Sequence, residues 1–159
     1  MLLSLRSALE KVLEAVVLLL MSGLAVIVIV GFIARSLGMP LTWSDELAPV
    51  LLAWLTYYGA ALAALNRAHI GFPRLVAAAP WRLQLGLTLF REAIVIGFFA
   101  VAAWAGWRVL LVVDDTYLVS LPWLPLAVTQ SVIPIGAVLF IVAELISYAD
   151  WLSRREPSA

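Results

Sequence analysis

The stretch that decides the fold is TWSDELAPVLLAWLTYYGAALAALNRAHI, which covers residues 42–70. Residues 47–65 carry no charge, and as an α-helix rising about 1.5 Å per residue they would extend about 29 Å. That length is enough to cross the hydrocarbon core of a bilayer. Asp45 and Glu46 precede the apolar run, and basic residues follow it. The stretch therefore predicts a membrane-spanning helix with an acidic start and a basic end.

The start of this helix carries a capping-box pattern, Thr42-x-x-Asp45. In a capping box the hydroxyl and the carboxylate accept hydrogen bonds from backbone N–H groups of the first turn, and acids there also suit the helix dipole. A cap does not require two adjacent carboxylates. We therefore keep two interpretations of Asp45 and Glu46: capping with interfacial anchoring, or binding of a cation or of a partner's basic group.

The composition of the whole chain indicates that lipid is its solvent. Of 159 residues, 65% are hydrophobic and 13% are charged, whereas soluble domains are about half apolar and a quarter charged. The formal net charge is zero and the basic residues are dispersed, which argues against nucleic acid as a partner. The absence of cysteine excludes disulfides and thiol chemistry, and with a single histidine we expect no metal site and no cofactor.

Further apolar segments predict an all-α integral membrane protein, a single membrane domain over residues 1–159. The first segment has 20 uncharged residues at 15–34, which is longer than a usual signal-peptide core, so we interpret it as a retained helix. The residues 70–79 are apolar enough for an interfacial segment on the membrane surface. We expect four transmembrane helices, at about 13–34, 46–65, 88–107 and 122–144.

The distribution of lysine and arginine predicts the orientation. With four spans, two of these residues, Arg35 and Arg108, fall at one side of the membrane. The positive-inside rule then places the other side, and both termini, in the cytoplasm. The eight basic residues of that side are Arg6, Lys11, Arg67, Arg74, Arg82, Arg91, Arg154 and Arg155.

The second helix carries small residues at a spacing that favours close helix packing. Gly59 and Ala63 are four residues apart, as are Ala60 and Ala64, and such small-xxx-small pairs promote helix association in lipid. Trp54 lies inside the same helix, so we expect it to pack. Trp43 and the other tryptophans near span ends are expected at the headgroup level.

The fourth span contains a proline in its middle. Pro134 cannot donate to the carbonyl of Gln130, so we expect a kink there. The polar groups of Thr129, Gln130 and Ser131 lie just before the proline and could satisfy the backbone at the kink.

Three ionisable residues have both a functional and a structural interpretation. Glu14 and Glu144 lie beside span ends. They could serve transport or a proton relay, or could be solvated or paired with Lys11, Arg82 or Arg91. His69 could be a ligand or proton carrier, or an interfacial hydrogen-bonding residue. For each, we favour the structural interpretation. The predicted positions of Ser, His and Asp on opposite sides of the membrane oppose a catalytic triad.

The chain resembles the small membrane subunit, of DctQ type, of tripartite ATP-independent periplasmic (TRAP) transporters. The resemblance covers nearly the whole chain, and five short motifs carry it: Trp43-Ser44-Asp45-Glu46-Leu47, Trp54-Leu55-Thr56, Gly59-Ala60-Ala61, Arg67-Ala68-His69-Ile70 and Ile133-Pro134-Ile135-Gly136.

This resemblance implies partners and a location. In such systems a large membrane subunit carries the substrate and sodium sites, and a periplasmic binding protein delivers an organic anion, often a carboxylate. The small subunit packs beside the large one in the cytoplasmic (inner) membrane of bacteria or archaea and contacts membrane lipids. The residues expected at the partner interface, or to support it, are Trp43, Asp45, Glu46, Trp54, Gly59, Ala60, Ala63, Ala64, Arg67, His69, Pro134 and Gly136.

We therefore expect a non-catalytic scaffold subunit for sodium-coupled uptake of an organic anion. The alternative is a self-sufficient small multidrug-type exporter that acts as a homo-oligomer, with Glu14 as the coupling residue. A membrane enzyme or a quinone-reactive protein is a third class, which the missing cysteine and the lone histidine oppose.

Overall fold

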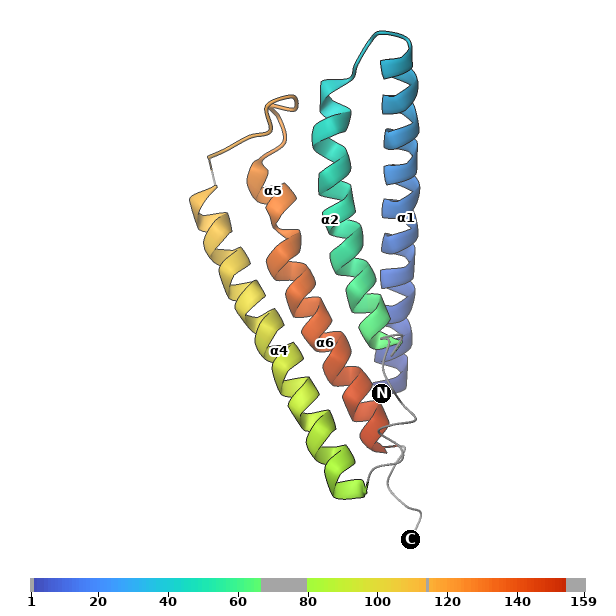
Figure 1. The fold of residues 1–159 in the computed structure, drawn as a ribbon, viewed down its shortest axis with the longest axis vertical. Coiled ribbons are helices and arrows are strands. Elements are labelled where there is room, and N and C mark those ends of the chain that lie inside the picture. The colour runs from blue at the N-terminus through green and yellow to red at the C-terminus, as the bar shows by residue number, and fades with distance from the viewer. Residues whose placement is uncertain (1, 67–79, 114, 154–159) are drawn as a thin grey trace.

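The computed structural model describes residues 2–66, 80–113 and 115–153. The described chain is helical apart from its connections (Figure 1). A single isolated β-bridge, between Tyr117 and Pro125, lies in the connection before the last helices. The helices are α1 (Leu2–Ser36), α2 (Thr42–Leu65), α4 (Trp81–Val112), α5 (Leu126–Gln130) and α6 (Val132–Ser153).

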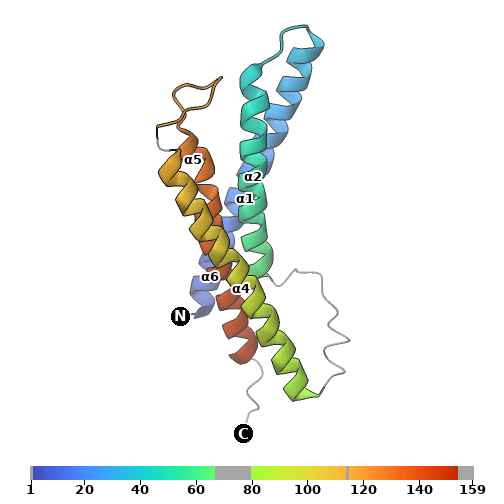
Figure 2. The same ribbon diagram turned by 60° about the vertical axis from the view of Figure 1, so that its left-hand side comes forward.

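The long helices stand side by side in the order α1, α2, α6, α4 (Figure 1). Each packs mainly on its neighbours in this order, so α2 and α6 are the inner helices and α1 and α4 the outer ones. When the molecule is turned, α4 crosses in front of α6 and α1 lies behind α2 (Figure 2). The start of α1 and the end of α6 lie at the same end of the molecule.

Within the part of the chain that the structure describes, four segments are long and apolar enough to cross a membrane: Arg6–Ser36, Thr42–Leu65, Leu83–Val112 and Leu126–Ala149. This confirms the predicted all-α class with four apolar helices that are candidate membrane spans. The outer helices expose large apolar side chains such as Leu18 and Phe32 on α1 and Phe90 and Phe98 on α4. Such surfaces are stable in contact with lipid and costly in water.

Three helix starts differ from the expected spans. The helix of the first span, α1, begins at Leu2 and not near residue 13, and that of the third span, α4, begins at Trp81 and not near residue 88. The fourth span begins at Leu126 and not near residue 122, because the preceding residues form a closed loop. In that loop Leu126 N donates to Thr116 O at 2.7 Å, and Leu118 N donates to Leu124 O at 3.2 Å.

The fourth span is interrupted at Ser131, which separates α5 from α6. The hydroxyl of Ser131 donates to Val128 O at 2.7 Å, and that of Thr129 donates to Leu126 O at 2.8 Å. Both hydroxyl groups thus bond to the backbone beside the interruption, but to the carbonyls of Leu126 and Val128 and not to the Gln130 carbonyl that Pro134 was expected to leave without a partner. They act on carbonyls of the turn before Ser131, where unpaired backbone groups would otherwise be costly in lipid.

The core lies between the inner helices and the first part of α1. The ring of Phe99 on α4 stacks on Phe140 with the centroids 3.8 Å apart. Arg6 on α1 donates to the Leu65 carbonyl at 3.1 Å, where the negative end of the α2 dipole favours a cation. The buried residues of this cluster are Leu13, Ala61, Ala64, Leu65, Phe140 and Ala143.

Glycines at two positions allow α6 to pack closely against α2 and α4. A Cβ added at Gly136 on α6 would lie 2.6 Å from the Cβ of Tyr57 on α2. A Cβ added at Gly106 on α4 would lie 2.8 Å from Pro134 Cδ and 3.0 Å from its backbone nitrogen. Both contacts are closer than any side chain permits, so these positions require glycine for the observed packing.

We expect Gly136→Ala to destabilise the chain, because α2 and α6 must separate to admit the methyl group. Overpacking of this kind costs about 1–3 kcal/mol, which should lower the unfolding temperature of the detergent-purified chain. The matched control is Gly97→Ala, since nothing lies within 4 Å of a Cβ there and alanine favours a helix. An unchanged unfolding temperature for Gly136→Ala would contradict the contact.

Candidate functional site

The acidic start of α2 forms two separate connections. Asp45 accepts a hydrogen bond from Arg35 Nη2 at 2.7 Å, in an exposed ion pair that joins α2 to the end of α1. Exposed pairs of this kind contribute about 0–1 kcal/mol. The pair therefore orients the turn between α1 and α2 more than it stabilises the fold.

The predicted capping box is wrong. The N-cap residue is Leu41, in an extended conformation, and no side chain caps the helix. Thr42 is already the first helical residue, so its hydroxyl is one position too far along to act as the cap. Ser44 instead donates its hydroxyl to Leu41 O at 2.7 Å and is buried.

Glu46 connects α2 to the loop before α5. Its Oε2 accepts the Ser120 backbone N–H at 2.9 Å and also the Ser120 hydroxyl. The two adjacent carboxylates thus contact two different elements, Asp45 the end of α1 and Glu46 the loop before α5. Their contact with a cation or a partner's basic group stays a prediction.

Trp54 lies where the last span is interrupted. Its indole Nε1 donates to the carbonyl of buried Thr129 at 3.0 Å, which joins α2 to α5. The ring also meets Tyr58 edge-on, with centroids 6.2 Å apart. Trp54 therefore packs, as expected, and in addition supplies a hydrogen-bond donor next to the helix interruption.

The small residues of α2 lie in different surroundings. Ala64 is buried in the core of the chain, and Ala60 packs against that core. A Cβ added at Gly59 would meet nothing within 4 Å. Of Gly59, Ala60 and Ala64, Gly59 is therefore the residue with open space beside it. Ala63 and Trp43 are half-buried, and the interface role of all five residues stays a prediction.

Some expected site residues lie elsewhere. Arg67 and His69, and the apolar stretch 70–79, fall outside the described residues. Pro134 and Gly136 lie in the contacts of α6 with α4 and α2. Glu14 is exposed on α1.

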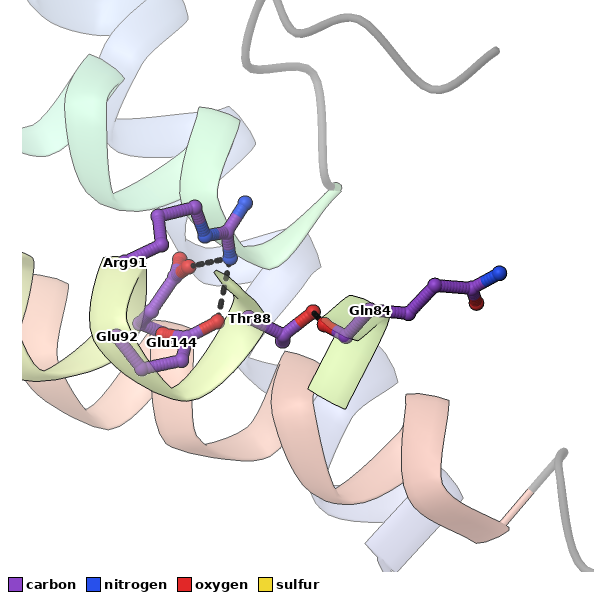
Figure 3. A network of polar contacts seen from close by, with 5 residues as sticks. All are labelled: Gln84, Thr88, Arg91, Glu92 and Glu144. Carbon is purple, nitrogen blue, oxygen red and sulfur yellow. Dashed lines mark hydrogen bonds and ion pairs between the residues drawn. The ribbon is translucent and has the colours of Figure 1, made fainter. Parts of the chain in front are cut away.

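A network of polar side chains joins the apolar helices α4 and α6 (Figure 3). Nη2 of Arg91 lies 2.6 Å from Glu144 Oε1 on α6 and 2.5 Å from Glu92 Oε1 beside it on α4. Both glutamates are buried, and the Arg91 side chain is half exposed. Thr88, one turn earlier, bonds to the Gln84 carbonyl at 2.8 Å. Of the alternatives left open for Glu144, which were solvation or a pair with Lys11, Arg82 or Arg91, the structure shows the pair with Arg91.

Glu92 is the residue that sequence reasoning missed. Its Oε2 is buried and has no hydrogen-bond partner among the described residues. The signal in the sequence was an acid–base pair, Arg91-Glu92, within an apolar helix. Whether the Glu92 side chain faces α6 depends on how α4 packs, and this packing cannot be read from the sequence.

The arrangement fits a structural role. Across residues 2–66, 80–113 and 115–153, no group of three or more His, Cys, Asp or Glu side chains could hold a metal ion. Several of the described polar contacts connect one helix or loop to another: Arg35 with Asp45, Glu46 with Ser120, Trp54 with Thr129 and Arg91 with Glu144. They are suited to holding helices in place and offer no arrangement of nucleophile and base.

Comparison with known families gives one match. A family model described as "Tripartite ATP-independent periplasmic transporters, DctQ component" matches residues 24–154. A search of curated proteins found no significant match.

We expect Arg91→Gln to destabilise the chain strongly. The substitution leaves two buried carboxylates without the guanidinium that both contact, and removing one partner of a buried ion pair costs about 3–5 kcal/mol. The measurement is the unfolding temperature in detergent, with Arg108→Gln as the control because Arg108 is exposed and stacks over Trp104. Similar losses for both variants would contradict the structural role of the network.

The Trp54 hydrogen bond gives a second test. Trp54→Phe keeps an aromatic ring but leaves the Thr129 carbonyl without its indole donor, which should cost about 1–2 kcal/mol in the membrane. The exposed Trp104 provides the control, Trp104→Phe. A smaller loss of stability for Trp54→Phe than for Trp104→Phe would argue against the bond.

Proposed function

Because the chain belongs to the family of DctQ components of TRAP transporters, we propose that it is the small scaffold subunit that holds a large transport subunit in the membrane. Its family consists of transporter components and not of enzymes. The chain is a multi-pass membrane protein with four candidate spans.

The proposal includes a transport system around this chain. The large subunit carries out sodium-coupled uptake of an organic anion, with a carboxylate as the expected class, and a periplasmic binding protein delivers it. The chain lies in the cytoplasmic membrane with both termini in the cytoplasm. The excess of arginine and lysine at that end of the spans supports this orientation.

The proposed scaffold role is supported by the arrangement of the long helices side by side in a row. Since α1, α2, α6 and α4 pack mainly on their immediate neighbours, the inner helices keep surface that a compact bundle would bury. On α2 this surface includes Gly59, which has open space beside it. In lipid, association of helices relies on close packing at such small residues, so we place the large subunit against this part of α2.

The alternative, a small exporter coupled through Glu14, has less support. A coupling carboxylate in a homo-oligomeric exporter is expected to face the interior of the bundle or an aqueous cavity. Glu14 is exposed at one outer helix of the row and near its beginning.

The proposal predicts the effect of enlarging Gly59. Gly59→Leu should reduce several-fold the amount of large subunit that co-purifies with the tagged chain, because the leucine fills the space that a neighbouring helix would occupy. The stability of the chain alone should not change, since no atom lies within 4 Å of the added Cβ.

The matched control is Gly23→Leu on α1, where a Cβ also meets nothing within 4 Å and where no interface is proposed. The co-purified partner is identified by mass spectrometry and quantified against the tagged chain. Equal recovery of the partner with Gly59→Leu and with the unmodified chain would rule out this interface.

A further inference from the structure

The loop between α4 and α5 is a closed, apolar hairpin. Leu126 N bonds to Thr116 O at 2.7 Å, Leu118 N bonds to Leu124 O at 3.2 Å, and Leu124 N bonds to Leu121 O at 2.9 Å. Residues 115–125 contain one charged residue, Asp115. These backbone bonds give the tip of the loop a defined shape.

The tip presents two large apolar side chains to its surroundings. Val119 is 89% exposed and Trp123 is 73% exposed. Holding such side chains in water costs free energy in proportion to their apolar area. A defined tip that exposes them indicates a surface that is covered in the working protein.

The contact with Glu46 sets the depth of the tip. Ser120, the neighbour of Val119, bonds through its N–H and its hydroxyl to Glu46. Glu46 directly precedes the uncharged residues 47–65 of α2, and one residue of helix corresponds to about 1.5 Å along the axis. The tip is therefore held at the level where the apolar span of α2 begins.

Exposed apolar residues also lie at the end of α4, shortly before the loop. The last turn of α4 exposes Leu111 and Val112, which belong to a candidate membrane span. The loop follows one residue later and adds Tyr117 and Trp123, aromatic residues of the kind that concentrate at membrane–water boundaries. The exposed apolar side chains, their level relative to the span of α2 and the presence of aromatic residues all indicate that lipid covers the tip of the loop.

We propose that this loop is an interfacial anchor, in which Val119 and Trp123 insert into the boundary between phospholipid headgroups and acyl chains. The Glu46–Ser120 contact holds the anchor at this depth. The anchor fixes the vertical position of the α4–α5 connection in the leaflet at this end of the spans. It requires that the chain spans a membrane and does not depend on the identity of the partner subunit.

The lack of cysteine allows a direct measurement of depth. A single Val119→Cys variant of the full chain is labelled with an environment-sensitive fluorophore, together with any membrane subunit that co-purifies. It is reconstituted in vesicles of phosphatidylethanolamine and phosphatidylglycerol that contain a lipid with a nitroxide near the headgroup. The control is Asp115→Cys, in the same loop and also exposed.

The expected result is several-fold stronger quenching by the lipid nitroxide at position 119 than at position 115, with the reverse order for aqueous iodide. Equal quenching by iodide at both positions would overturn the anchor. Shielding of position 119 that appears only after a partner protein is added would overturn it too, because the occupant would then be that protein.

A second pair of variants tests the role of Glu46. Adding Glu46→Ala to the labelled Val119→Cys chain should reduce the nitroxide quenching at position 119. Asp45→Ala should not, because Asp45 pairs with Arg35 and not with the loop. The helix content by circular dichroism is measured for both, so that unfolding is recognised. A folded Glu46→Ala variant with unchanged quenching would overturn the proposed control of depth.

Discussion

The close packing of α6 between α2 and α4 is the constraint on which the rest of the structure depends. Lipid offers helices little hydrophobic drive to associate, so packing distance decides the stability of the contact. Gly136 lets α6 approach Tyr57, and Gly106 lets α4 approach Pro134. The stacking of Phe99 on Phe140 across α4 and α6 lies within the same packed arrangement.

The polar contacts secure this packing at different levels of the row. Glu46 holds the loop before α5, the indole of Trp54 reaches the carbonyl of Thr129, and Arg91 joins Glu144 across α4 and α6. Glu46, Trp54 and Arg91 each bond to a group on another element, which lowers the cost of burying polar groups. Oε2 of Glu92 is an exception, because it is buried and has no hydrogen-bond partner among the described residues. The chain thus uses several of its few polar residues to fix helix positions, which agrees with the proposed scaffold role.

The spans could be predicted from the sequence because long uncharged runs leave few alternatives. The scarcity of charges limited the possible partners of Glu144 to a few basic residues, and the structure shows that the partner is Arg91. The capping box failed because the cap is decided by the backbone of Leu41, with φ −94° and ψ 103°, and not by the side-chain pattern. The late start of α5 was missed because apolar residues at 121–125 suit a lipid-facing helix and an apolar loop equally.

The central claim is that this chain works as one subunit of a larger membrane complex. The most direct test is native mass spectrometry of the tagged chain, extracted in mild detergent from its own membrane. The account predicts a complex in which the chain is bound at a fixed ratio to one large, many-span membrane protein. A homogeneous oligomer of this chain alone, with transport activity after reconstitution, would contradict it.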